Sequence, residues 1–328
     1  MTATRPPVAE TAPVDAPSTG PVVTRTRKPL RVRLRNDWPL LIMAVPMVGL
    51  LVVFQYVPML GNVMAWKDYS PYVGIINSAN VGWQNFERVL GDPAFWQATR
   101  NTVAITSVQL VLYFPIPIIL ALLLNTILSK RIKMAIQAIT YMPHFFSWVI
   151  VVAIFQQMFG GAGLLNRFLR SNGFEPMDIM TNPDTFILLL TSQSVWRDAG
   201  WGMIVFLAAL STVDISQYEA AAVDGASSLR RMWHITLPAL KPVIILLLIL
   251  RLGDSLSVGF EQLILQREAV GAGAAEVLDT FVYYTGVVNG DWSYGAAAGL
   301  IKGVVGMLLV IGANKVAHAF GEAGVYHK

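Results

Sequence analysis

The sequence contains no cysteine and little charge. Cysteine is absent from the 328 residues, which excludes disulfide bonds, iron–sulfur ligation and thiolate zinc sites. Charged residues make up 13% of the chain and apolar residues 55%, and the mean hydropathy is +0.55. This balance is too apolar for an ordinary soluble domain, so the composition favours a protein whose solvent is a lipid bilayer.

Catalytic and nucleotide-binding motifs are also missing. The sequence has no G-x-x-x-x-G-K-[ST] loop, so we expect that the chain does not itself hydrolyse ATP. It contains neither H-E-x-x-H nor G-x-S-x-G, and its four histidines are too scattered to indicate a metal site. The sequence therefore predicts neither an enzyme nor a bound cofactor.

Six apolar segments are long enough to cross a bilayer, because a spanning helix needs about 20 mostly apolar residues. They lie at 40–60, 102–124, 135–158, 185–212, 242–262 and 294–318. We therefore predict an all-α integral membrane protein with six transmembrane helices. The membrane domain is placed at 37–328, after a basic tail at 1–36 whose composition predicts disorder and a cytoplasmic position.

Positive charge is concentrated on one side of these segments. The stretches 125–134 and 213–241 and the two chain ends hold most of the clustered Lys and Arg residues, whereas the other connections carry only scattered ones. By the positive-inside rule, both termini and these two stretches face the cytoplasm. Because the basic residues adjoin apolar spans, the isoelectric point near 9.3 is attributed to membrane orientation and not to nucleic-acid binding.

Charged residues inside the spans must face protein or water, because a charge at the bilayer centre costs at least ~2.5 kcal/mol. Polar and aromatic residues recur at helical spacing in the fourth and fifth segments, and we interpret them as lining a translocation path suited to sugars. The candidates are Gln193, Trp196, Arg197, Trp201, Arg251, Asp254, Glu261 and Gln262. The alternative is an ion pair between Arg251 and Asp254 that only locks helices together.

The most specific pattern lies in the predicted cytoplasmic loop 213–241. Helix formers occupy 217–223, and Gly225 follows at a position where helices commonly stop. A second helical stretch at 228–236 is expected to end before Pro238. Two short helices at the membrane surface suit docking into a groove on a partner protein, although a plain surface linker is an alternative.

This loop resembles the signature loop of binding-protein-dependent ABC importer permeases. Glu-Ala-Ala is followed by three residues, Gly, nine residues and Ile-x-Leu-Pro. The resemblance implies the type I ABC importer permease fold, a bacterial cytoplasmic membrane location and a loop that couples to an ATPase subunit. The candidate coupling residues are Glu219, Ala220, Ala221, Asp224, Gly225, Arg230, Arg231, Leu237 and Pro238.

The stretches 233–238, 258–262 and 290–295 are similar to the carbohydrate branch of that family, in particular to importers of oligosaccharides and polysaccharide fragments. The resemblance implies three protein partners: ABC ATPase subunits, an extracytoplasmic solute-binding protein and a second permease chain. A heterodimer of permeases is expected, and a homodimer stays open. The alternatives are a permease of the same fold for a peptide or phosphate, and a membrane sensor or enzyme whose loop matches by coincidence.

Overall fold

The structure, a computed structural model, describes residues 30–127 and 129–319. Most of the predicted tail at 1–36 therefore lies outside the described residues. The first described helix begins at Leu30, before the first predicted span at 40–60. The internal contacts divide the chain into two units, Met1–Met59 and Leu60–Lys328. Each unit is described separately below.

The N-terminal unit is helical from Leu30 to Met59. Its elements are α1 (Leu30–Leu51), the π-helix η1 (Val52–Tyr56) and α2 (Val57–Met59). The N–H of Val57 bonds to the carbonyl of Val52, five residues back. This wider turn directly precedes Pro58, whose ring would clash with the preceding turn of a regular helix. Every described side chain from residue 37 to residue 59 is exposed, as expected of an apolar surface that meets lipid or another protein.

The larger unit begins with a group of short elements. In chain order they are η2 (Leu60–Trp66), β1 (Lys67–Asp68), α3 (Gly74–Asn77), β2 (Ala79–Asn80) and α4 (Gln84–Gly91). The two strands pair antiparallel, with Lys67 opposite Asn80. The buried amide of Asn85 donates to the carbonyls of Ala65 and Lys67, each at 3.0 Å. These bonds hold α4 against the segment that precedes it.

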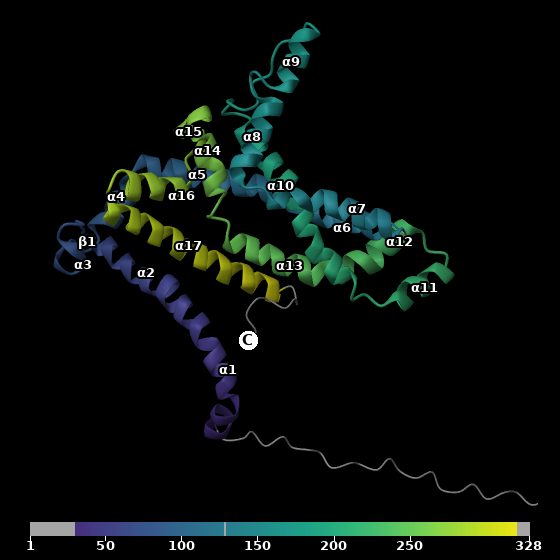
Figure 1. Ribbon diagram of the computed structural model, residues 1–328, viewed down its shortest axis with the longest axis horizontal. Coiled ribbons are helices and arrows are strands. Elements are labelled where there is room, and N and C mark those ends of the chain that lie inside the picture. The colour runs from purple at the N-terminus through teal and green to yellow at the C-terminus, as the bar shows by residue number, and fades with distance from the viewer. Residues whose placement is uncertain (1–29, 128, 320–328) are drawn as a thin grey trace, which may run out of the picture. The chain divides into compact units, whose positions relative to one another are not determined.

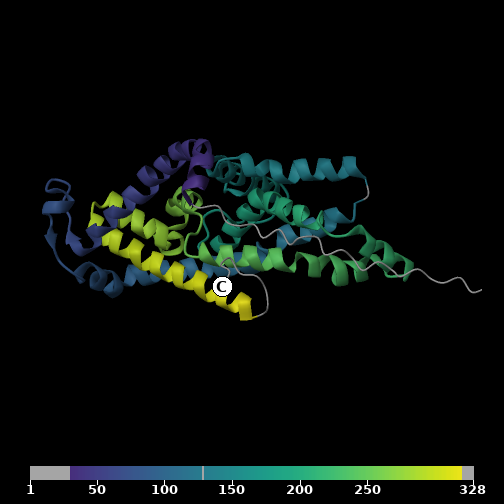
Figure 2. The same ribbon diagram turned by 90° about the horizontal axis from the view of Figure 1, so that it is seen from below.

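Longer helices make up the rest of the unit. The first group is α5 (Pro93–Leu112), α6 (Pro115–Asn125), α7 (Lys130–Tyr141), the 3₁₀ turn η3 (Met142–Phe145), α8 (Trp148–Phe159), α9 (Leu164–Ser171) and α10 (Phe186–Leu210). The second group is α11 (Ile215–Val223), α12 (Ser228–Arg231), the π-helix η4 (Met232–Thr236), α13 (Leu237–Gly253), α14 (Phe260–Val270), α15 (Ala272–Ala275), α16 (Leu278–Val282), the π-helix η5 (Tyr283–Val288) and α17 (Trp292–Ala319). Helix α10 packs along α6 and α7 (Figure 1). Figure 2 shows α13 and α17 side by side.

Among the described residues, five helical segments are long and apolar enough to cross a membrane. They are Asp37–Trp66, Pro93–Asn125, Trp148–Ser171, Ser228–Gly253 and Trp292–Ala319. A sixth candidate combines α10 with α11, which are bent by 76° relative to each other. Helix α10 alone has 25 residues, more than the ~20 that a span needs. We therefore assign α10 as the remaining span, the fourth in chain order, and α11 to the loop. The prediction of an all-α integral membrane protein is confirmed.

The third predicted span, 135–158, is interrupted. Helix α7 ends at Tyr141 and α8 begins at Trp148, with η3 between them. Pro143 stands in the interruption, where its missing N–H is tolerated. The hydroxyl of Ser147 then caps α8 by accepting a hydrogen bond from the N–H of Ile150 at 3.5 Å. An uninterrupted apolar stretch in the sequence therefore folds as two helices.

The fifth predicted span, 242–262, is also wrong in its limits. The helical segment runs from Ser228 to Gly253, and an irregular stretch separates it from α14, which begins at Phe260. Gly259 just before α14 has φ +44°, in the left-handed region that favours glycine. The two serines in this stretch favour turns over helix interiors, which explains why the helix stops inside the apolar stretch.

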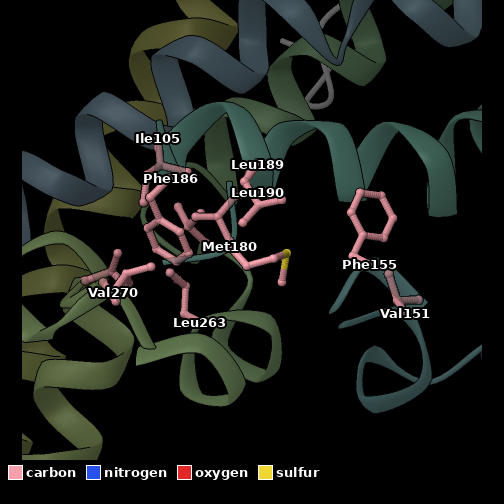
Figure 3. Packing of buried hydrophobic residues seen from close by; sticks show 12 residues of the cluster. Ile105, Val151, Phe155, Met180, Phe186, Leu189, Leu190, Leu263 and Val270 are labelled. Atoms are coloured by element: carbon pink, nitrogen blue, oxygen red, sulfur yellow. The ribbon is translucent and has the colours of Figure 1, made fainter. Parts of the chain in front are cut away.

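Three clusters of buried apolar side chains hold the larger unit together. In the first, Phe186 of α10 lies among Ile105 of α5 and Leu263 of α14 (Figure 3). The second joins α4, α5, α16 and α17 around Phe281. The third joins α6, α10 and α13 around Met203. Helix α10 contributes to the first and third clusters and contacts α5, α6, α7, α8 and α13, whereas α17 packs on α13 and on the short elements η2, α4, α16 and η5.

Helix α17 approaches η5 most closely at Gly295. A Cβ atom placed there would lie 2.6 Å from the Cα atom of Gly286, a distance at which two carbon atoms repel strongly. At Gly303, two four-residue steps further along α17, a Cβ atom would meet nothing within 4 Å. Glycine is therefore a packing requirement at the first position and not at the second.

We expect Gly295→Ala to destabilise the purified protein by about 1–3 kcal/mol, the usual cost of forcing an extra carbon into a packed contact. The measurement is the Tm in detergent by tryptophan fluorescence. Gly303→Ala is the matched control, because it makes the same chemical change on the same helix without a clash. Equal losses of Tm in the two variants would rule out the close contact as the cause.

Candidate functional site

The loop between α10 and α13 begins with a capped helix. The carboxylate of Asp214 accepts a hydrogen bond from the N–H of Ser216 at 2.9 Å and so caps α11. Hydrogen bonds from the Ser216 side chain and backbone hold the pKa of Asp214 below its usual value. The cap therefore stays ionised down to a lower pH than an unperturbed aspartate would.

Gly225 ends this helix in a Schellman turn. The N–H of Ala226 bonds to the carbonyl of Ala221 at 2.9 Å, and the N–H of Gly225 bonds to that of Ala222 at 3.1 Å. Gly225 has φ +72°, a backbone conformation that residues other than glycine rarely adopt. The helix and the turn predicted from 217–225 are thus confirmed, and Gly225 has a specific conformational reason to be glycine.

The second helix of the loop does not end before Pro238, contrary to expectation. Ser227 caps α12, which continues through η4 into α13 as one helical segment, Ser228–Gly253. The N–H of Leu237 bonds to the carbonyl of Met232, five residues back. This wider turn makes room for the proline ring, as at Pro58, so the helix continues. The candidates Leu237 and Pro238 therefore lie at the start of α13, inside this continuous helical segment.

The rest of the loop presents its side chains to the outside. The hydroxyls of Tyr218 and Thr236 lie 3.0 Å apart and connect its two halves. The exposed coupling candidates are Glu219, Ala220, Asp224, Gly225, Arg230 and Pro238, while Ala221, Arg231 and Leu237 are half-buried. The apolar side chains of Val223, Leu229 and Trp233 are 88%, 63% and 58% exposed. A surface of this kind, apolar with charged neighbours, is typical of a protein contact.

Three glutamines form a buried cluster between α10 and α14. The Oε1 atom of Gln193 accepts hydrogen bonds from the amides of Gln262 at 2.7 Å and Gln266 at 3.0 Å. Gln262 also donates to the carbonyl of Leu190 at 3.1 Å. The predicted residues Gln193 and Gln262 thus come together, but their amides mainly satisfy each other. Gln266 was not predicted, although its position four residues after Gln262 places both on one helix face.

A polar cavity of about 190 Å³ lies beside this cluster, between α5, α8, α10, α13 and α14. It brings together three predicted path residues: Arg197, Arg251 and Gln262. Its other polar and aromatic members were not predicted from the sequence: Gln109, Tyr113, Trp148, Ser194, Asp198 and Ser257. For Gln109 and Tyr113, the spacing of four residues on the second predicted span was a usable signal, because it places both on one helix face.

Arg197 ties α10 to the interruption between α7 and α8. Its Nε donates to the carbonyl of Phe146 at 3.0 Å, and its guanidinium carbon lies 4.5 Å from the centre of the Trp148 ring. A second nitrogen lies 3.5 Å from the carboxylate of Asp198, which also bonds to Nδ1 of His144 at 2.8 Å. In the described chain, no three His, Asp or Glu side chains gather as metal ligands.

Arg251 is not paired with Asp254, so the ion-pair alternative is wrong. Its guanidinium donates to Oε1 of Gln109 at 2.7 Å and lies 5.6 Å from the centre of the Tyr113 ring. Helix α13 ends at Gly253, so Asp254 does not continue the helical face of Arg251. Asp254 instead borders a second cavity of about 580 Å³.

The predicted stripe along the fifth span is therefore not continuous. The second cavity is also lined by Lys302 and Asp279, whose side chains form an ion pair. Glu261 is exposed on α14 and is not a lining residue of the polar cavity described above. The irregular stretch between α13 and α14 thus separates the acidic candidates from Arg251.

The two predicted tryptophans of α10 lie apart from the polar cavity. Trp196 borders a mostly apolar cavity of about 880 Å³ between α8, α10 and the chain before α10. Trp201 stacks on His144, with ring centres 4.6 Å apart. Of the eight predicted path residues, only Arg197, Arg251 and Gln262 line the same polar cavity.

The sequence and the fold of this chain are both similar to those of known transport proteins. The sequence profile of the "Binding-protein-dependent transport system inner membrane component" family matches residues 113–319. The polygalacturonan/rhamnogalacturonan transport system permease protein YteP of Bacillus subtilis is 42% identical over 97% of this chain and 100% of its own length. Protein LplB of the same organism is 44% identical over 89% of this chain and 92% of its own. The fold is similar to one chain of a bacterial alginate ABC transporter, whose structure was solved in complex with an alginate pentasaccharide-bound periplasmic protein. The TM-score is 0.82 and the sequence identity 33%, over 90% of this chain and 99% of that chain.

We expect Gln193→Leu to destabilise the protein by about 1–3 kcal/mol, because it removes the oxygen that accepts a hydrogen bond from each of the buried amides of Gln262 and Gln266. The measurement is again the Tm in detergent. Gln157→Leu, an exposed glutamine on α8, is the control and should change stability by no more than about 0.5 kcal/mol. Replacing all three cluster glutamines by Leu should recover part of the loss, since no partner is then left unsatisfied. A triple variant with the summed loss would contradict the hydrogen-bonding explanation.

Proposed function

The chain belongs to the family of binding-protein-dependent transport system inner membrane components, and from that premise we propose that it is the permease subunit of an ABC importer for oligosaccharides. The observation that carries this proposal is the similarity to sugar permeases along almost the whole chain. The chain is a multi-pass protein of the cytoplasmic membrane and a transport subunit, not an enzyme. Its partners are ABC ATPase subunits, a second permease chain and a solute-binding protein outside the cell.

The loop 213–241 is the proposed contact with an ATPase subunit. The chain has no phosphate-binding loop of its own, so the energy of ATP hydrolysis must enter through a contact between proteins. The loop supports this role because it is structured by its own caps and turns, and it leaves Glu219, Arg230 and three apolar side chains exposed. A partner groove that covers Val223 and Leu229 would also pair with these charges.

The polar cavity is the proposed section of the translocation path in this chain. Arginines, amides, hydroxyls and two aromatic rings line it at the level of the membrane spans. Sugars offer hydroxyl groups for such donors and acceptors, and C–H faces for the rings of Trp148 and Tyr113. The glutamine cluster beside the cavity has the structural role of joining α10 to α14.

In the proposed orientation, the coupling loop and both termini face the cytoplasm. The clustered Lys and Arg residues at 125–134 and 213–241 support it. ATP is hydrolysed in the cytoplasm, so a loop that contacts the ATPase must lie on that side. The short elements between Leu60 and Gly91 then lie outside, where a binding protein delivers the substrate.

Charge reversal at the loop tests the coupling role. We expect Glu219→Lys to weaken co-purification of the ATPase and to lower oligosaccharide uptake by about tenfold or more, which corresponds to ~1.4 kcal/mol of lost contact. Glu175→Lys, an equal charge reversal at an exposed site before α10, should leave both unchanged. Normal ATPase recovery and uptake with Glu219→Lys would refute the assignment of this loop.

The absence of cysteine makes a direct test of orientation possible. We expect a cysteine at Tyr72, a position that is 99% exposed, to react in intact cells with a maleimide that cannot cross membranes. A cysteine in place of the exposed Ser129 should react only after the membrane is permeabilised. The reverse pattern of labelling would contradict the proposed orientation.

A further inference from the structure

Arg251 is a cation in the membrane region that has no anionic partner among residues 30–127 and 129–319. Its guanidinium contacts the neutral amide of Gln109 and the ring of Tyr113. Among the described residues, no carboxylate lies within ion-pair distance of its guanidinium. An uncompensated charge away from water is costly, and arginine is always charged at physiological pH.

The cavity that Arg251 lines has a net positive charge. It contains a second guanidinium, that of Arg197, and a single carboxylate, that of Asp198. Asp198 is already shared between Arg197 and His144. The one carboxylate of the cavity is thus paired with Arg197 and His144, and Arg251 keeps donors for which the cavity supplies no further negative charge.

The remaining lining fits a sugar more closely than a free inorganic anion. Ser194 and Ser257 offer hydroxyl groups, Gln262 offers its amide oxygen, and Trp148 offers an aromatic face. The volume of about 190 Å³ is below the roughly 300–1,000 Å³ of sites that hold a whole drug-sized ligand. The cavity therefore accommodates one residue of an oligosaccharide and not the whole chain.

We propose that this cavity selects acidic oligosaccharides, with Arg251 binding the carboxylate of a uronic acid residue as it passes through the membrane. The planar guanidinium matches a carboxylate by two parallel hydrogen bonds. Gln109 holds the arginine in position, and Arg197 adds to the positive potential of the cavity. This inference rests on the proposed function of the chain as an oligosaccharide permease.

A structural role for Arg251 makes a different prediction. If the arginine only joined α13 to α5 through Gln109, its loss would impair the binding of every oligosaccharide to the same extent. Recognition of a carboxylate, by contrast, affects only the acidic ones. Comparing an acidic sugar with its neutral counterpart therefore separates the two roles.

The test measures binding of trigalacturonate and of neutral galactotriose to the complete importer in nanodiscs, with ATPase subunits that bind but do not hydrolyse ATP. We expect the unmodified importer to prefer trigalacturonate, and Arg251→Gln to lower its affinity for this ligand by about tenfold while binding of galactotriose stays the same. Arg251→Lys should retain part of the preference because it keeps the charge. Arg100→Gln, an exposed arginine on α5, is the matched control. Size-exclusion chromatography checks that each variant assembles.

Several outcomes would overturn the proposal. Equal weakening of both ligands by Arg251→Gln would assign the arginine to helix packing. A preference of the unmodified importer for galactotriose would refute selection of acidic sugars while leaving an oligosaccharide importer in place. If the assembled importer with active ATPases transports neither sugar, the proposed function itself fails.

Discussion

The structure depends on one constraint: within a bilayer, each polar group of the chain must find its partner inside the protein. Water is not available there to satisfy a freed carbonyl or an unpaired amide. The glutamine cluster meets this constraint, because Gln193, Gln262 and Gln266 satisfy one another. The Lys302–Asp279 pair meets it by neutralisation. Arg251 meets it only in part, with neutral partners, and this shortfall distinguishes the cavity that it lines.

The same constraint explains where the helices are interrupted. Irregular backbone at membrane depth is tolerated where it is covered by protein or borders a cavity. The interruption between α7 and α8 is covered by α10, since Arg197 donates to the carbonyl of Phe146. The interruption between α13 and α14 borders two cavities, and Ser257 lines both. The irregular segments therefore coincide with the polar surface that a transported solute needs.

Local signals in the sequence were sufficient for the first helix and the turn of the loop 213–241, but not for the membrane site. The helix over 217–223 and the turn at Gly225 follow from residues close in the chain, so they could be predicted. The interruption after Gly253 was missed, although Ser255, Ser257 and Gly259 are turn-forming residues, because the longer stretch 242–262 around them was interpreted as one span. That error carried over to Arg251 and Asp254, which share a face only if the helix is continuous. The partner that Arg251 has, Gln109, is distant in sequence, and only the tertiary structure, in which α10 contacts both α5 and α13, brings the two side chains together.

The loop and the cavity are connected by the two helices that flank the loop. Arg197 stands 13 residues before the end of α10 (210 − 197), and Arg251 stands 14 residues after the start of α13 (251 − 237). At about 1.5 Å per residue, both arginines lie roughly 20 Å along their helices from the end of α10 and the start of α13. A helix transmits displacement along its length because its turns are hydrogen-bonded to each other. Movement of the loop by an ATPase would therefore change the separation of α10 and α13 at the level of the two arginines, and so the access of a solute to the cavity between them. In this arrangement the chain needs no chemistry of its own, because the geometry of two helices connects the proposed ATPase contact to the proposed site of passage.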